Sequence, residues 1–514
     1  MSRPRTEVPL EETWRLEDVF PSAADYAAGL KAVADAIPAV TRFRGRLGES
    51  AAILLECLDA LERLEELAQR VATYAQMQQS VDGTDPNSQA AYAQMAAVMA
   101  RMETETAFVR SELVALPDQV LDGFMTAEPG LAPFQTLREE IRTFKQHALT
   151  AEGELVLAYF SELRSSPEQT YMMATTADMR FETVNSSTGE PVPVSLMGLF
   201  LHAEHSPDRE LRRNAYASLW KGLAPYRNTL ASALAAKIRS DVAESRLRGY
   251  DSVFTMLLQQ PSTSGIMPDG VSVEVFDNVL DTIQTELAPH MQRLARLRQR
   301  VLGIERMELC DVKAPLDPDF NPAVSYDEAA RMIADSVEVM GPEYSQIIRT
   351  ALRDRWIDRA DNIGRAGMAF CQPVYGVHSY VFSSFTGNLG STFPLAHELG
   401  HAAHMEMAMR SQRITNFRFA TFFVEAPSTL GEQLLADHLR RTSSDKRMHR
   451  LVNTLLLGSY HHDFITHLLE AELLRRLYRM AQNDEPLTEA IISREKGAIL
   501  RRFWGDSVAV DESA

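Results

Sequence analysis

The sequence predicts a mainly α-helical fold with a small β element. Residues 22–150 are rich in Ala, Leu, Glu and Arg and contain few glycines, a composition that favours helices. Strand-like patterns are confined to two short stretches, residues 179–194 and 371–392. Apolar residues elsewhere recur at helical spacing, as in the series Leu54, Leu58, Leu61 and Leu64.

The N-terminal region is expected to form an extended lead-in followed by a helical bundle. Residues 1–20 contain two prolines and precede a third, which favours extended or turn conformations. Ser22 and Asp25 have the spacing of a capping box at a helix start. The methionines between Met77 and Met102 are interpreted as core residues of this bundle.

The middle of the chain contains a predicted β-hairpin and a long, interrupted helix. In residues 179–194, β-branched and aromatic residues flank a turn-forming segment at 185–189, which is typical of a hairpin with a longer loop. Pro207 in a first helical position predicts a helix start. The helix is expected to reach about Arg246, with a kink or break at Pro225.

The C-terminal half is predicted to be helical again after a short β segment. Ser325 and Glu328 form a capping-box pattern at a helix start. In residues 371–392, Gly, Ser, Thr and aromatic residues replace Ala and Leu, so we expect one or two short strands there. Helices are expected over about 394–410 and about 422–480.

The pattern HExxH at residues 397–401 lies on the predicted helix and suggests a metal site. His397 and His401 are four residues apart, so they share one helical face and can bind one ion. Glu398 is then placed to accept a proton from a water molecule on that ion and to pass it to a leaving amine. A surface helix with two unrelated histidines is the alternative interpretation.

A catalytic zinc ion needs three protein ligands and one open position. Glu425 is the favoured third ligand, because a carboxylate from a second helix would complete a His₂Glu site. Glu432 and His404 are the alternatives, although His404 lies two turns along the helix from His397. The carboxylate that does not bind the metal would accept a hydrogen bond from the second ring N–H of a ligand histidine. Such sites also accept cobalt or manganese.

Composition excludes several classes of protein. The chain of 514 residues has a net charge of −18, which disfavours a nucleic-acid-binding role. It contains neither a secretory signal pattern nor an uncharged apolar stretch long enough to span a membrane. Cys57, Cys310 and Cys371 are far apart and predict neither a disulfide framework nor a CxxC metal site. We therefore expect a cytoplasmic protein.

The sequence resembles the oligoendopeptidase F family, relatives of thimet oligopeptidase, nearly from end to end. The resemblance rests on these segments: Trp14-Arg15-Leu16-Glu17-Asp18-Val19-Phe20-Pro21, Arg246-Leu247-Arg248-Gly249-Tyr250, Arg355-Trp356-Ile357-Asp358, Tyr375-Gly376-Val377-His378-Ser379-Tyr380, Leu395 to His404, and Glu425-Ala426-Pro427-Ser428 with Glu432.

The resemblance implies a two-lobed helical shell around a deep channel that admits short peptides and excludes folded proteins. It also implies one zinc ion per chain, with Glu425 as the third ligand beside His397 and His401. A strand near 380–385 would pair with the substrate backbone. His378 and Tyr380 are further candidates for substrate contact, with a structural role beside the cleft as the alternative.

The resemblance also implies a C-terminal segment with a His and several Tyr that stabilises the developing oxyanion. This sequence ends at Ala514, before such a segment is recognised. His461, His462 and Asp463 do not replace it, since they lack the tyrosines. Loss of an oxyanion donor typically lowers turnover by about 10²–10³-fold.

Three functional hypotheses follow. The first is a zinc metalloendopeptidase that hydrolyses short oligopeptides, with residues 1–200 as an N-terminal helical domain and 201–514 as the catalytic domain. The second is a zinc-bearing, catalytically weak peptide-binding protein that lacks the oxyanion-stabilising segment. The third is a zinc hydrolase of another amide. The oligomeric state is not predicted by any of these patterns.

Overall fold

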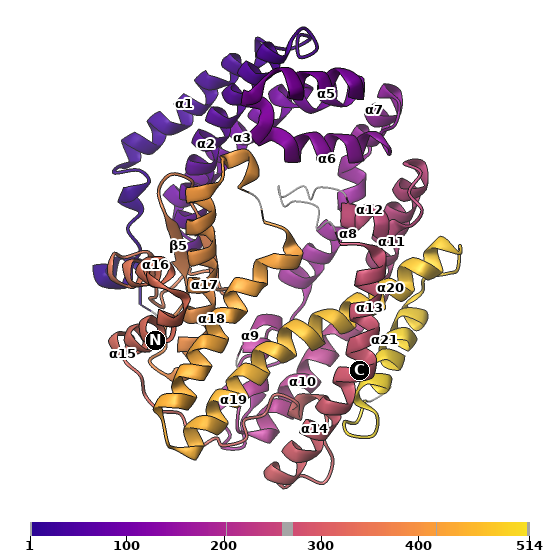
Figure 1. Cartoon of the computed structure of the whole chain (residues 1–514). Helices are drawn as coiled ribbons and strands as arrows, with labels where there is room; N and C mark the ends of the chain where they lie inside the picture. The colour runs from indigo at the N-terminus through magenta and orange to yellow at the C-terminus, as the bar shows by residue number, and fades with distance from the viewer. Residues whose placement is uncertain (1–2, 202, 260–270, 418, 511–514) are drawn as a thin grey trace. The chain divides into compact units, whose positions relative to one another are not determined.

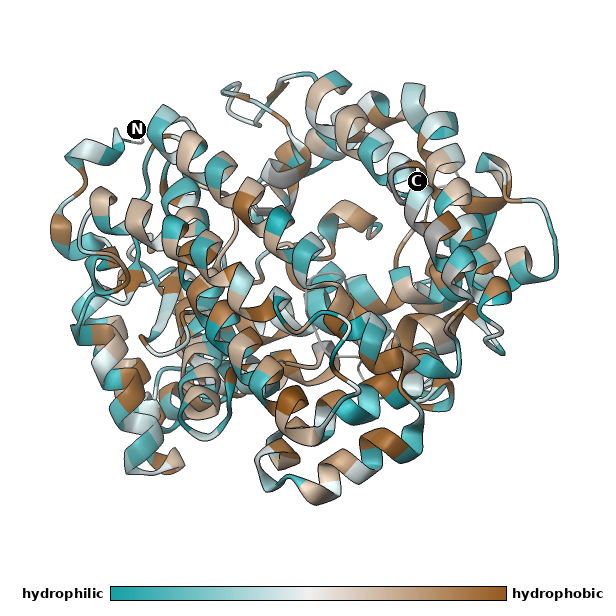
Figure 2. Ribbon diagram, turned by 90° about the horizontal axis from the view of Figure 1, so that it is seen from above, coloured by the Kyte–Doolittle hydropathy of each residue, from teal (hydrophilic) through white to brown (hydrophobic). Residues whose placement is uncertain are grey.

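Helices dominate the computed structural model, which describes residues 3–201, 203–259, 271–417 and 419–510 (Figure 1). The predicted mainly helical fold class is confirmed, since strands are few and short among these residues. Hydrophobic and hydrophilic residues occur together along most helices (Figure 2), as expected of helices that bury one face.

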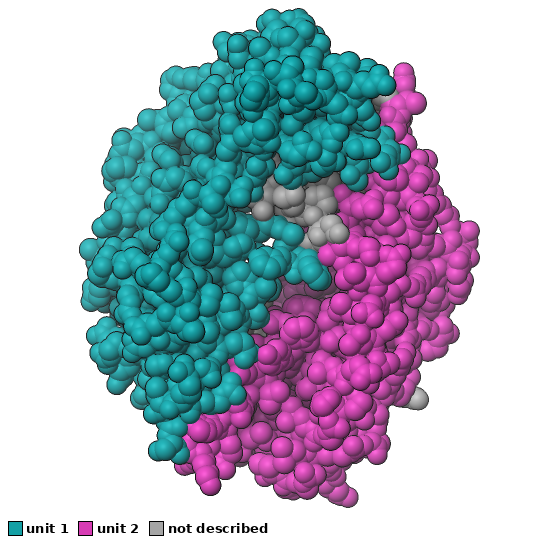
Figure 3. Space-filling model, viewed as in Figure 1, with its two compact units in different colours: residues 1–146, 261–269, 321–444 teal, residues 147–260, 270–320, 445–514 magenta. Residues whose placement is uncertain are grey.

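The described residues form two compact units, each assembled from separate stretches of chain (Figure 3). Unit 1 contains described residues of 3–146 and 321–444, and unit 2 contains those of 147–259, 271–320 and 445–510. The predicted division into 1–200 and 201–514 is a division of the sequence and stays a prediction.

Unit 1 contains a helical bundle, a three-stranded sheet and the helix with the HExxH pattern. Its helices and strands are α1 Ala23–Thr41, α2 Ala51–Val81, α3 Pro86–Thr106, α4 Phe108–Ala115, α5 Asp118–Ala127, α6 Gln135–Lys145, α15 Tyr326–Ser336, α16 Pro342–Arg353, β3 Ile357–Asp358, β4 Phe370–Pro373, β5 Ser379–Phe382, α17 Leu389–Ser411 and α18 Thr421–Thr442.

Unit 2 contains the remaining helices and a small hairpin. Its elements are α7 Ala151–Tyr159, α8 Ser161–Met173, β1 Val184–Asn185, β2 Pro191–Val192, α9 Leu196–Leu201, α10 Arg209–Leu223, α11 Arg227–Leu247, α12 Val253–Gln259, α13 Val273–Thr282, α14 Ala288–Leu302, α19 Lys446–Tyr460, α20 His467–Gln482 and α21 Glu489–Trp504.

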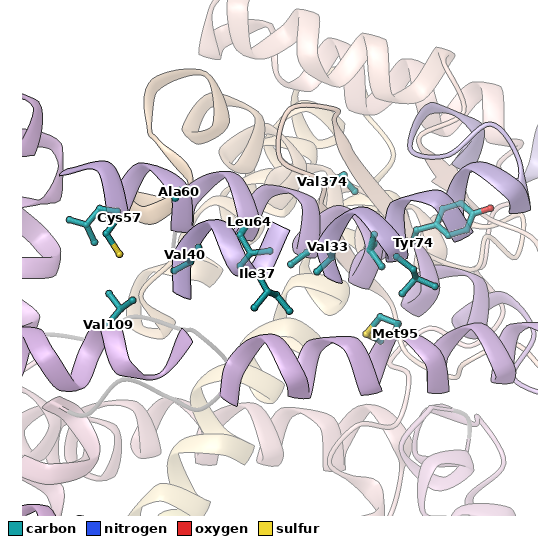
Figure 4. Close-up of a cluster of buried hydrophobic side chains, with 14 of the residues drawn as sticks. Val33, Ile37, Val40, Cys57, Ala60, Leu64, Tyr74, Met95, Val109 and Val374 are labelled. Atoms are coloured by element: carbon teal, nitrogen blue, oxygen red, sulfur yellow. The ribbon is translucent and has the colours of Figure 1, made fainter. Parts of the chain in front are cut away.

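The core of unit 1 forms where α1, α2 and α3 pack together (Figure 4). Val33 and Ile37 of α1 are fully buried, and Leu64 of α2 and Met95 of α3 lie in the same cluster. The predicted methionine contribution is present, since Met77 is also fully buried there. The cluster extends to Trp14, Tyr380 and Phe382, so the lead-in segment packs on the sheet.

The lead-in is anchored to the sheet rather than free. Its short 3₁₀ turns are tied to the segment around β3, where Arg15 N donates to Arg355 O at 2.8 Å and Arg359 N donates to Glu12 O at 2.9 Å. Arg5 and Arg365 both pair with the buried carboxylate of Asp358 in β3.

The sheet has the strand order β3-β5-β4. β5 is parallel to β3 and antiparallel to β4, with Val381 paired to Ile357 on one side and to Cys371 on the other. α17 contacts both β4 and β5. The small predicted β element therefore supports the HExxH helix directly.

Several predicted element boundaries are confirmed. Ser22 caps α1 by accepting from Asp25 N at 3.2 Å, and Ser325 and Glu328 form the predicted capping box of α15. The hairpin β1–β2 is antiparallel, with two residues in each strand. The break at Pro225 separates α10 from α11.

Three predicted boundaries were wrong. The helix after Pro207 begins at Arg209, because Asp208 accepts from two backbone N–H groups and acts as the N-cap. α17 begins at Leu389 rather than near Pro394, since Asn388 caps it with a bond from Ser391 N at 3.0 Å. Pro394 removes one helical hydrogen bond in the second turn without ending the helix.

The third error concerns the predicted helix over 422–480, which is three helices. α18 ends at Thr442, and Asp445 starts α19 by accepting from Arg447 N at 2.8 Å. A π-helical turn over His461–Thr466 then separates α19 from α20. The two breaks were missed because the apolar periodicity continues on both sides of each.

We expect Leu64→Ala to lower the free energy of unfolding by about 2–5 kcal/mol, because it leaves a cavity in the core of unit 1. Leu64 is 1% exposed. Leu10→Ala is the control, since Leu10 is 63% exposed and its truncation should change stability by about 0.5 kcal/mol or less. Urea unfolding measures both, and equal destabilisation would contradict the predicted core.

Candidate metal centre

Contacts with the sheet hold α17 in place independently of its metal-ligand candidates. Glu406, near its C-terminal end, is 5% exposed and accepts from Ser379 N at 2.7 Å and from Ser379 Oγ at 3.1 Å. Burial raises the pKa of Glu406, and the two bonds from Ser379 partly offset this. The helix that carries HExxH is therefore fixed to β5.

α17 and α18 approach each other through two glycines. A Cβ atom on Gly400 would lie 2.4 Å from Pro427 O, and one on Gly431 would lie 2.6 Å from Ala396 O. Neither distance is sterically possible, so the two backbones can come this close only at positions without side chains. This contact sets how far the carboxylates of α18 are from the histidines of α17.

Three side chains from these helices converge on one point. Glu425 Oε2 lies 3.1 Å from His397 Nε2 and 3.3 Å from His401 Nε2. Donor atoms of the three residues all lie within 4.8 Å of one another. The structure thus brings together the two HExxH histidines and the carboxylate that the sequence analysis favoured.

These distances fit a tetrahedral metal site. Donors about 2.0–2.2 Å from one ion at tetrahedral angles are separated by roughly 3.3–3.6 Å. The two measured separations are close to that range, and two imidazoles with one carboxylate are a donor set that zinc prefers. The Glu425 side chain is 56% exposed, so one side of the group is open to solvent.

Glu432 contacts the far side of His397. Its Oε1 lies 2.7 Å from His397 Nδ1, and Glu432 itself is 4% exposed. A carboxylate in this position can fix the ring orientation, and Nε2 of the same ring faces Glu425 Oε2. Of the alternatives for third ligand, Glu432 is therefore placed to orient a ligand instead of binding the ion.

The electrostatics of the group favour a cation. Burial opposes protonation of His397, but hydrogen bonds with Glu425 and Glu432 outweigh it and raise the pKa of the ring to about 10. The bonds from His397 and His401 hold the pKa of Glu425 far below its usual range. Carboxylates that stabilise a positive charge on His397 this strongly would also stabilise a metal ion in its place.

Glu398 lies beside this group in a poorly solvated position. It is 6% exposed, and its Oε2 has no hydrogen-bond partner among the described residues. Burial raises the pKa of Glu398 to about 6, with His397 and His401 acting in the opposite direction. Burial raises the pKa of the Cys371 thiol in β4, and the negative charge of Glu398 raises it further. The carboxylate is thus available for proton transfer beside an edge strand.

His404 does not join the metal group. Its ring packs against Phe419 at 4.8 Å and Phe423 at 5.8 Å between centroids. His404 is not among the three residues whose donor atoms lie within 4.8 Å of one another, which are His397, His401 and Glu425. This agrees with its position further along the helix.

The side chains of His378 and Tyr380 both make hydrogen bonds within the protein. His378 Nδ1 lies 2.9 Å from Ser379 O and its Nε2 lies 3.2 Å from Asp18 Oδ2, while its ring stacks on Trp356 at 4.4 Å. Tyr380 is fully buried and donates to Arg15 O at 3.0 Å. These contacts account for both residues structurally, and their roles in substrate binding stay predictions.

The expected pairing of substrate with the strand near 380–385 stays a prediction, and the structure disfavours it over Ser379–Phe382. β5 already has β3 on one side and β4 on the other. Beyond it, Ser383 N and Phe385 N donate to Asp358 O and Arg359 O, both at 3.0 Å. Because β5 is a central strand, its backbone groups are already used within the sheet. β4 is the edge strand beside α17.

Sequence reasoning missed the residues that position the donors. Ser428 is fully buried, and its hydroxyl lies 2.8 Å from Glu425 Oε2. Gly400, Gly431 and Glu406 also act on α17 and α18 without resembling site residues. The available signal was that two glycines lie inside long predicted helices, where glycine is unfavourable unless packing requires it.

Comparisons with known proteins agree over nearly the whole chain. Residues 202–514 match a family model described as Peptidase family M3, and residues 112–181 match one described as Oligopeptidase F. Oligopeptidase PepF of Bacillus subtilis is 27% identical over 508 residues, which cover 99% of this chain and 74% of the relative. Group B oligopeptidase PepB of Streptococcus agalactiae is 25% identical and covers 98% and 82%.

Solved structures show the same fold. A crystal structure from Chlamydophila abortus has a TM-score of 0.84 at 23% identity and covers 99% of this chain and 84% of that one. Oligoendopeptidase-F from Enterococcus faecium has a TM-score of 0.68 at 21% identity, with coverage of 96% and 82%.

We expect Gly400→Ala to weaken zinc binding by about tenfold or more, because the added methyl group would push α18 and Glu425 away from the histidines. Gly123→Ala in α5 is the control, since no atom lies within 4 Å of its added Cβ. Competition with a chelating dye measures both affinities. Wild-type affinity in a folded Gly400→Ala variant would contradict the proposed close approach.

Glu432→Ala should lower zinc affinity by about 10–100-fold, because His397 loses the acceptor that fixes its ring. Glu432→Gln should lose less, since an amide oxygen can still accept from Nδ1–H. The same dye competition ranks the two variants. If the alanine and glutamine variants bind zinc equally well, Glu432 does not position His397.

Proposed function

Because the chain belongs to peptidase family M3, we propose that it is a zinc metalloendopeptidase that hydrolyses internal peptide bonds of short oligopeptides. The observation that carries the proposal is the convergence of His397, His401 and Glu425 beside the buried carboxylate of Glu398. His397, His401 and Glu425 would hold one zinc ion, which when bound supplies a Lewis acid for activating water and polarising a carbonyl.

Glu398 is the proposed general base. It accepts a proton from the attacking water and then donates it to the amine of the leaving product, so one residue serves both halves of the reaction. Its buried, partnerless oxygen supports this role, since a pKa of about 6 leaves it ionised near neutral pH yet able to hold a proton briefly. No covalent intermediate with the protein is needed.

Glu432 and Ser428 serve as positioning residues. Glu432 holds His397 in the tautomer whose Nε2 faces the metal position, and Ser428 lies beside the oxygen of Glu425 that faces both histidines. The edge strand β4 is the candidate for binding an extended substrate backbone, since it has one strand partner, β5, and lies beside α17.

Short peptides are the proposed substrates. Both relatives named above are called oligopeptidases, and the net charge of −18 disfavours nucleic acid. Within the described residues, no helix is both long and apolar enough to cross a membrane. Cys57, Cys310 and Cys371 form no disulfide, which supports a proposed cytoplasmic location.

The alternative function is a zinc-bearing peptide-binding protein with weak catalysis. It has the same metal group and would bind peptide without turnover. A zinc hydrolase of another amide is the third candidate, and it would prefer capped single amino acids over peptides.

We expect Glu398→Gln to lower hydrolysis of a quenched fluorescent peptide of roughly eight residues by about 10²–10⁴-fold, because the general base is lost. Zinc content should stay at one ion per chain, since Glu398 is not a proposed ligand. Glu343→Gln on α16 is the control, an exposed carboxylate paired with Arg410. Activity of the wild type should disappear with a chelator and return with zinc.

The outcomes separate the three functions. A wild type that binds zinc and peptide without cleaving supports the peptide-binding protein, and faster cleavage of capped amino acids supports the other hydrolase. Full activity of Glu398→Gln would contradict the proposed mechanism.

A further inference from the structure

Unit 2 contains a buried polar network that the proposed peptidase mechanism does not use. At its centre Asp311, which is fully buried, pairs with Arg209 and Arg212, each at 2.9 Å. Nearby, Glu204 pairs with Lys313 at 2.6 Å and accepts from the hydroxyl of Tyr216. Arg209, Arg212 and Tyr216 lie on α10, and Glu204 and Asp311 lie in two short turns that contact it, Ala203–His205 and Leu309–Asp311. Lys313 follows the second turn.

Arg298 of α14 is buried without a counter-charge. It is 5% exposed, its one hydrogen bond goes from NH1 to Val312 O, and its Nε has no partner among the described residues. No ion pair involves it within that part of the chain. Burial lowers its pKa to about 10, and repulsion from Arg212 adds to this. A buried guanidinium normally requires a paired anion.

His461 is the second orphaned group. Both ring nitrogens are buried, and neither has a hydrogen-bond partner among the described residues. The ring stacks on Trp504 at 6.2 Å, at the start of the π-helical turn His461–Thr466. Such turns interrupt the regular helical bonding and are frequent at functional sites.

Arg298 and His461 belong to the same place in unit 2. Ala295, one turn before Arg298, and Ile465, one turn after His461, lie in one hydrophobic cluster with Val312 and Trp504. Arg298 donates to Val312 O, Lys313 is the next residue, and Val312 lies in that cluster with Trp504, on which His461 stacks. Burial lowers the pKa of His461 to about 3, and the cations of Lys313 and Arg298 lower it further.

The local charge balance is positive. Five cationic side chains of the described network (Arg209, Arg212, Arg213, Arg298 and Lys313) face three carboxylates, those of Asp311, Glu204 and Glu308. The excess of two positive charges lies within a largely buried region, where unpaired charge is costly.

We propose that Arg298, His461 and Lys313 form a binding site for a small monovalent anion in unit 2. Arg298 Nε–H and one ring N–H of His461 would donate to the anion, and Lys313 would add positive charge beside its bond with Glu204. Halide and formate share the required chemistry, because each carries one negative charge and accepts several N–H donors.

A metal ion is a poorer occupant of this region. The donor atoms of Glu308, Cys310 and Asp311 are close enough together to suggest one. However, Arg209 and Arg212 already neutralise Asp311, and burial raises the pKa of the Cys310 thiol to about 12. A protonated thiol and a carboxylate paired with two arginines would bind a cation weakly.

The test uses the full chain in a chloride-free buffer at constant ionic strength, with sodium gluconate as the bulky replacement anion. We expect chloride and formate, titrated separately, to raise the Tm in a saturable manner. Arg298→Gln and His461→Phe should each weaken the apparent anion affinity by about tenfold or more. Arg296→Gln is the matched control, because Arg296 lies on the same helix, is 45% exposed and pairs with Asp506.

Bromide soaked into crystals of the wild type gives a second measurement that does not depend on variants folding. An anomalous peak within hydrogen-bond reach of Arg298 and His461 supports the site, and stabilisation by formate alone identifies a carboxylate as its ligand. The proposal is overturned if every anion raises the Tm equally. It is also overturned if chloride and formate raise the Tm of Arg298→Gln as much as that of Arg296→Gln. A bromide map without a peak near Arg298 and His461, together with no rise in Tm on adding formate, also overturns the proposal.

Discussion

The candidate metal centre depends on one steric constraint, the direct backbone contact between α17 and α18. Gly400 and Gly431 allow this contact, because a Cβ atom at either position would overlap a backbone carbonyl of the other helix. At this separation Glu425 reaches the Nε2 atoms of both histidines, while Glu432 reaches His397 Nδ1. A wider spacing would leave the same residues on facing helices without a common point.

The rest of unit 1 holds that helix pair in place. α17 packs on β4 and β5, and Glu406 ties it to the backbone of Ser379. The sheet in turn receives the lead-in segment through Trp14 and the buried pairs of Asp358 with Arg5 and Arg365. Residues more than 300 positions apart in the sequence therefore support the same few donor atoms.

Both functional proposals rest on buried polar groups that the protein itself leaves incompletely satisfied. Near the metal centre these groups include Glu398 Oε2 and His401 Nδ1, and the carboxylates of Glu425 and Glu432 that contact His397 favour a cation. In unit 2 they are nitrogen-rich, with orphan atoms on Arg298 and His461, and the chemistry favours an anion. Because unsatisfied buried groups are rare and costly, each set points to a ligand of opposite charge.

The sequence by itself determined the helical class and the HExxH pair, because periodicity, capping and the spacing of two histidines are local properties. Spacing left Glu425, Glu432 and His404 as candidates for the third ligand, and the family resemblance favoured Glu425. The sequence also located the hairpin and the break at Pro225. Tertiary structure decided what depends on distant partners. β5 is a central strand, Glu432 contacts His397 Nδ1, His378 contacts Asp18, and Tyr380 donates to the backbone of Arg15. Spacing along a chain does not encode which backbone approaches which, so the glycine contact that assembles the site became visible only after folding.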